Sequence, residues 1–193
     1  MSKLTLSAVG ALVALGTASA ASAVPFIESG DAGQTLDTAQ IITSDFDSIE
    51  GTLAEGTDTA DIFTFAFAGG TFTAETTSAL FDTELFLFAE DGTFLAGDDD
   101  GAPDINICDD DDGSPTPLCS LISIDLDAGI YSLGISTFNS TASDGILNAG
   151  AGPITAPGSY TILVSGDGID VPAPGALALF GLGILGLGLR RSR

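Results

Sequence analysis

Histidine and tryptophan are absent from this sequence, and lysine and arginine together number only four among its 193 residues. All four cations lie near an end of the chain, at Lys3, Arg190, Arg191 and Arg193. The absence of histidine excludes catalytic triads that depend on an imidazole. The absence of lysine from the rest of the chain excludes Schiff-base chemistry there. With no histidine and only two cysteines, a zinc site is not expected either.

The scarcity of positive charge contrasts with 27 acidic residues, which all lie between Glu28 and Asp170. A body spanning residues 24–170 would carry 0 − 27 = −27 charges, and no internal salt bridge can form in it. Its carboxylates must therefore be solvated, hydrogen-bonded by backbone N–H groups, or bound to cations. Nucleic-acid binding is not expected, because nothing could neutralise the phosphates. Adaptation to high salt, plain solubility and divalent-cation binding all explain this acidity equally well.

Residues 1–23 have the pattern of a secretory signal peptide. A positively charged start precedes an apolar stretch that is too short to span a bilayer as a helix. Ala21 and Ala23 then supply the small-residue cleavage pattern, which makes Val24 the predicted mature start. A cut after Ala20 is the second option, and a buried N-terminal helix is the alternative to export.

The last residues carry a separate signal. Val171, Pro172 and Pro174 precede an apolar stretch from Gly175 to Leu189, and an arginine cluster that includes Arg190 and Arg191 follows it. As a helix, this stretch would reach about 22 Å, against about 30 Å for the hydrocarbon core of a bilayer. That length suits a transient anchor with the arginines on the cytoplasmic side better than a stable span. An uncleaved anchor is the alternative.

Short apolar segments with period-two alternation occupy the body between these ends, and turn residues separate them. About eight strands are expected, at 45–53, 61–67, 71–77, 84–88, 93–96, 121–126, 130–138 and 159–165. In one of them Phe63, Phe65 and Phe67 share a face, and a hairpin around Gly69 and Gly70 is expected to pair it with the next strand. The pattern predicts one all-β domain over 24–170, an antiparallel β-sandwich or jelly roll.

Aspartates concentrate after the densest apolar segment, in a stretch without periodicity. They are Asp98, Asp99, Asp100, Asp104, Asp109, Asp110, Asp111 and Asp112. Calcium takes about six to eight oxygen ligands, which this loop could supply from two sides. No EF-hand pattern fits, so calcium is an expectation from composition, and a solvated acidic loop is the alternative.

Cys108 and Cys119 enclose ten residues of this acidic stretch. In an exported protein the default expectation for two such cysteines is a disulfide. Two free thiols are the alternative.

Two stretches resemble known families. The tail VPAPGALALFGLGILGLGLRRSR resembles a PEP-CTERM sorting signal, although Ala173 stands where the motif has glutamate. The resemblance implies export in a Gram-negative bacterium, transient membrane insertion and cleavage by an exosortase-like enzyme. Most of residues 28–166 resembles a bacterial pre-peptidase C-terminal domain, in the segments ESGDAGQTLDTAQ, TADIFTFAFAGG, DTELFLFAEDGTFLAGDDDG, LDAGIYSLGIS and GSYTILVSG. That likeness implies a jelly-roll-like accessory module, with residues 102–120 as an insertion.

Together these observations predict an exported, non-catalytic protein of the cell envelope or extracellular matrix. Its expected partners are the export machinery, an exosortase-like enzyme and exopolysaccharide, and calcium is its only expected cofactor. A module that binds or hydrolyses carbohydrate is one alternative function. A stably membrane-anchored surface protein is the other.

Overall fold

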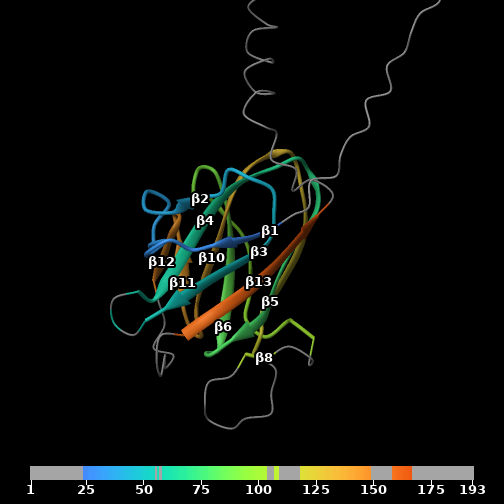
Figure 1. Cartoon of the computed structure of the whole chain (residues 1–193). Helices are drawn as coiled ribbons and strands as arrows, with labels where there is room; N and C mark the ends of the chain where they lie inside the picture. The colour runs from blue at the N-terminus through green and yellow to red at the C-terminus, as the bar shows by residue number, and fades with distance from the viewer. Residues whose placement is uncertain are drawn as a thin grey trace, which may run out of the picture.

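The computed structural model describes residues 24–54, 56, 58–103, 107–108, 118–148 and 158–166. These residues form thirteen strands joined by turns, and most of the strands lie in two stacked sheets (Figure 1). No helix among them is long and apolar enough to cross a bilayer. The predicted signal helix and tail helix both lie outside the described residues.

The two sheets are mixed in strand direction. Sheet I contains β1 (Val24–Ile27), β3 (Phe46–Leu53), β13 (Gly158–Gly166), β5 (Gly70–Ala79) and β8 (Ile107–Cys108) in that order, with β9 (Leu121–Leu126) also paired to β5. Sheet II contains β2 (Gln40–Ile41), β4 (Ala60–Phe67), β10 (Gly129–Thr137), β6 (Thr83–Ala89) and β7 (Phe94–Asp98). A separate hairpin consists of β11 (Thr141–Ser143) and β12 (Ile146–Asn148).

All eight predicted strands are present, as β3, β4, β5, β6, β7, β9, β10 and β13. Five further strands, β1, β2, β8, β11 and β12, have only two to four residues each. The prediction of a purely antiparallel sandwich was wrong, because β1, β2 and β8 each pair in parallel with a longer strand. Strands this short carry too little periodicity to be recognised or oriented from the sequence.

The predicted hairpin between β4 and β5 was also wrong. Gly69 and Gly70 do form a turn, with φ of 99° and 118°, but it carries the chain from sheet II to sheet I. The two strands then face each other across the core, where the rings of Phe65 and Phe72 stack with centroids 5.4 Å apart. A two-glycine turn permits either arrangement, and the aromatic residues on both strands favour the one that buries them.

Apolar alternation accounts for the core. Phe63, Phe65 and Phe67 all face the space between the sheets, and they are at most 3% exposed. In β6, apolar residues occupy both faces of the strand. Leu85 and Leu87 face the same core, whereas Phe86 and Phe88 belong to a second cluster that Leu147 of β12 also joins. Burial on both faces explains the uninterrupted apolar run of β6, which was predicted to be a central strand.

Candidate metal-binding site

Asp61 is a carboxylate inside the sandwich. It lies on β4 two residues before Phe63, so the period-two geometry turns its side chain toward the core, and it is 0% exposed. Its Oδ2 accepts a hydrogen bond of 2.6 Å from the hydroxyl of Tyr160, on β13 of the opposite sheet. Its Oδ1 is buried and accepts no hydrogen bond from the part of the chain that the structure describes. An ionised oxygen in this position is costly unless a cation or proton compensates it.

Asp31 and Asp58 complete a group of three carboxylates with Asp61. Each offers an oxygen, and these oxygens all lie within 4.8 Å of one another. Asp58 is held by two backbone hydrogen bonds to Ala54, one through its N–H and one through its C=O. Its Oδ1 is also buried, with no hydrogen-bond partner among the described residues. Asp31 is exposed, and its Oδ1 accepts a bond of 2.6 Å from the N–H of Gly33.

Glu28 lies beside this group, at the end of β1. Its Oε1 accepts a hydrogen bond from the N–H of Ala32 at 3.1 Å, and its Oε2 accepts one from the N–H of Thr52 at 2.8 Å. Gly51 makes this close approach possible, because a Cβ there would collide with the Tyr160 ring and the Glu28 carboxylate. Two strands of sheet I and the loop after β1 therefore converge on Asp61.

Burial and mutual repulsion dominate the electrostatics of the group. Burial, together with the charges of Glu28, Asp58 and Asp31, raises the pKa of Asp61 to about 8, and the hydrogen bond from Tyr160 opposes this shift. Burial also raises the pKa of Asp58 to about 6, and it raises the pKa of Glu28. No lysine or arginine occurs between residues 4 and 189 to relieve this repulsion. A bound cation is the remaining means of keeping all of these groups ionised.

The donor set fits calcium. Asp31, Asp58 and Asp61 present only hard oxygen atoms, and calcium takes about six to eight such ligands from carboxylates, carbonyl groups and water. Three carboxylates that bind through one or both oxygens supply part of that number, and backbone carbonyls or water could supply the rest. Zinc fits poorly, because the chain has no histidine and both cysteines are oxidised.

The structure places the aspartates that were predicted as calcium ligands in different surroundings. Asp99 and Asp100 meet Asp82, with oxygens within 4.8 Å of one another, and burial raises the pKa of Asp99. Asp98 instead acts on the backbone, because its Oδ2 accepts bonds of 2.7 Å from the N–H groups of Gly101 and Leu121. The remaining five, Asp104, Asp109, Asp110, Asp111 and Asp112, lie outside the described residues. Calcium binding in that loop stays a prediction.

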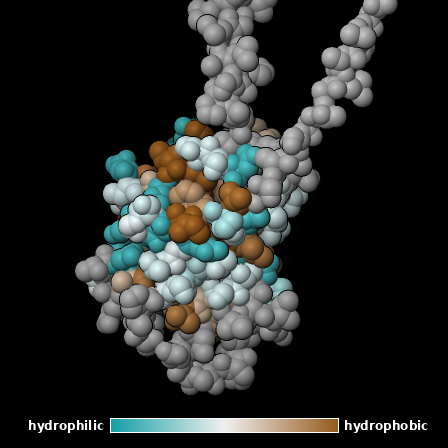
Figure 2. All heavy atoms as spheres, in the orientation of Figure 1, coloured by the Kyte–Doolittle hydropathy of each residue, from teal (hydrophilic) through white to brown (hydrophobic). Residues whose placement is uncertain are grey.

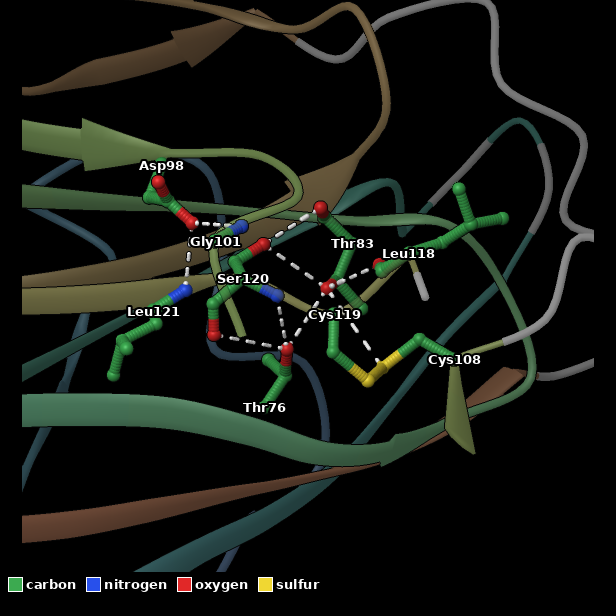
Figure 3. The surroundings of a disulfide bond; sticks show 9 residues. All are labelled: Thr76, Thr83, Asp98, Gly101, Cys108, Leu118, Cys119, Ser120 and Leu121. Atoms are coloured by element: carbon green, nitrogen blue, oxygen red, sulfur yellow. Dashed lines mark hydrogen bonds between the residues drawn. A yellow bond between two sulfur atoms is a disulfide. The ribbon is translucent and has the colours of Figure 1, made fainter. Parts of the chain in front are cut away.

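The predicted disulfide between Cys108 and Cys119 is present, with the Cα atoms 5.1 Å apart and both residues buried. Beside it, the hydroxyls of Thr76, Thr83 and Ser120 meet at 2.9–3.0 Å (Figure 3). These residues come from β5, β6 and the segment before β9, so the disulfide lies where both sheets are tied together. Figure 3 also shows Asp98 bonded to Leu121, the first residue of β9.

Sequence reasoning missed Asp31, Asp58, Asp61 and Asp82 as candidate ligands. A signal for Asp61 was available. It has the same strand parity as Phe63, Phe65 and Phe67, so alternation alone placed a carboxylate on the buried face of a chain body without cations. Asp31 and Asp58 lie in turns, where acidic residues are ordinary, and only the folded structure brings them to Asp61.

Comparison with known proteins identifies the tail. Residues 170–193 match the PEP-CTERM protein-sorting motif, which agrees with the resemblance seen in the sequence. This motif implies an exported, envelope-associated surface protein of Gram-negative bacteria that an exosortase-like enzyme processes. Among solved structures, the chain is similar to the pre-peptidase C-terminal domain of a collagenase from Bacillus anthracis. That match has 16% identity and a TM-score of 0.39, and it covers 65% of this chain and 93% of that domain. No curated protein matches the sequence.

Proposed function

We propose that this protein is a non-catalytic component of the cell envelope or extracellular matrix, in which one β-sandwich domain over residues 24–170 is stabilised by calcium. The observation that carries the envelope assignment is the sorting motif at 170–193. The sandwich is exported behind its signal peptide, held briefly at the inner membrane by the apolar tail, and released into the exopolysaccharide layer when the tail is cut. Strands β1 to β6 alternate between the two sheets, which supports a jelly-roll-like topology.

The calcium assignment rests on the buried and unpartnered Oδ1 of Asp61, within reach of Asp31 and Asp58. Calcium concentrations outside a cell suit sites of modest affinity, and binding only to the folded state would stabilise that state. An acidic body without cations benefits further, because each bound ion removes two charges of self-repulsion. Asp99 and Asp100, with Asp82, form a second place where calcium could bind.

Tail processing is tested by the intact mass of the protein recovered from the envelope and medium of its host. The expected mass lacks residues 1–23 and everything after about Pro174. Replacing Pro172 and Pro174 with alanine is expected to leave most of the protein with its tail, because the processing enzyme recognises the segment just before the apolar stretch. The same replacement at Pro153 and Pro157 is the matched control and should be processed normally. A mature protein that retains Arg190 and Arg191 would instead identify a stably anchored surface protein.

A further inference from the structure

A groove of about 490 Å³ opens on sheet I where β1, β3 and β13 lie side by side. It is lined by Ile27, Glu28, Gly30, Glu50, Gly51, Thr52, Ser159, Tyr160 and Thr161. The strand register places Glu50 between Ile27 and Thr161, and it places Thr52 beside Ser159. Figure 2 shows the face of the molecule that carries these strands, with apolar residues in small groups among hydrophilic ones.

The lining of the groove combines polar and apolar surface, and among the described residues that line it the only charges are negative. Glu50, Thr52 and Ser159 are exposed, so their carboxylate and hydroxyl oxygens are available to a ligand. The floor at Gly51 is bare backbone, because the ring of Tyr160 and the carboxylate of Glu28 fill the space behind it. The volume lies within the range of small-ligand sites, roughly 300–1,000 Å³.

The charge of the lining determines which class of ligand the groove can bind. Two glutamates line the groove, and no cation occurs between residues 4 and 189. Phosphorylated, sulfated and uronic-acid ligands would therefore be repelled. A ligand that carries both hydroxyl groups and an ammonium group would pair with Glu50 and exchange hydrogen bonds with Thr52, Ser159 and Thr161.

We propose that this groove binds a saccharide with free amino groups, as part of a polymeric amino sugar at the cell surface. Such a ligand would give the protein its own hold on a polysaccharide layer after the tail has been removed. The proposal rests on the proposed envelope function and extends it by naming the class of partner. It does not require calcium, although Glu28 lines the groove and its charge also acts on Asp61.

The test is calorimetric titration of the mature protein, purified from its host, with oligomers of glucosamine, N-acetylglucosamine and a uronic acid. The glucosamine oligomer is expected to bind at least about tenfold more tightly than the N-acetylated one, because one charge-assisted hydrogen bond has about that effect on affinity. No binding of the uronic-acid oligomer is expected. Titrations in calcium and in EDTA separate this proposal from the calcium site, since saccharide binding should persist in both.

Glu50→Gln is expected to weaken glucosamine-oligomer binding about tenfold, for the same reason. Asp47→Asn is the matched control, because it removes the same charge from an exposed position on the same strand and should leave the affinity within about twofold. Equal losses in both variants would show general attraction to an acidic surface and overturn the proposal. Absence of glucosamine-oligomer binding would overturn it, and so would equally tight, Glu50-dependent binding of a lysine oligomer of the same charge.

Discussion

In calcium-free buffer, the free energy of unfolding is expected to fall as the pH rises from about 4 to about 8. Asp61 alone would contribute up to about 5 kcal/mol to this fall. Burial raises the pKa of Asp61 to about 8 in the folded protein, whereas an aspartate in an unfolded chain titrates near 4. Between these two values the folded state holds a proton that the unfolded state has lost. The stabilisation from Asp61 is therefore complete below about pH 4. It declines as the pH rises and is lost once the pH has passed about 8.

Denaturant unfolding at a series of pH values in EDTA, followed by circular dichroism, measures this dependence. Asp61→Asn keeps an oxygen for the Tyr160 hydroxyl but cannot ionise, so its stability should vary much less over the same range. Asp47→Asn, at an exposed position outside the carboxylate group, should retain the wild-type slope. If wild type and Asp61→Asn lose stability in parallel, the buried carboxylate is not the cause.

Removal of the Cys108–Cys119 disulfide is expected to lower the free energy of unfolding by about 3 kcal/mol, from loop-closure entropy alone. The structure near the bond should loosen more than the rest of the domain. Cys119 is 0% exposed, and the segment after it bonds to Thr76 of sheet I and Thr83 of sheet II. Loosening this segment would therefore release contacts to both sheets. Four consecutive aspartates, Asp109–Asp112, lie in the closed loop and would favour its expansion.

Cys108→Ala combined with Cys119→Ala tests this expectation without leaving a buried thiol. Urea unfolding gives the change in stability, and hydrogen exchange at the amides of Ser120 and Leu121 gives the local change. Both amides bond within this junction, so their exchange should accelerate more than that of amides in β10. An unchanged denaturation midpoint, or acceleration spread evenly over the chain, would contradict a junction held by the disulfide.

The strands could be predicted from the sequence where alternation is long, as in β4 with Phe63, Phe65 and Phe67. The disulfide could be predicted as well, because export leaves few other roles for two cysteines. The pairing of the strands was harder to predict, because the turn at Gly69 and Gly70 fits a hairpin as well as a crossing between sheets. The cluster of Asp31, Asp58 and Asp61 was harder still to predict. Asp31 is thirty residues from Asp61 in sequence, and packing against Tyr160, rather than any local motif, makes Asp61 a candidate ligand.

The calcium site is tested most directly by thermal unfolding of the mature wild-type protein and Asp61→Asn, each in millimolar calcium and in EDTA. If calcium is present at about 100 times its dissociation constant, the folded state gains about 2.7 kcal/mol. For a domain of this size, that gain corresponds to a rise in Tm of at least about 5 °C. We expect this rise in the wild type and little or none in Asp61→Asn. An absent shift in the wild type, or an equal shift in Asp61→Asn, would contradict calcium binding at Asp31, Asp58 and Asp61.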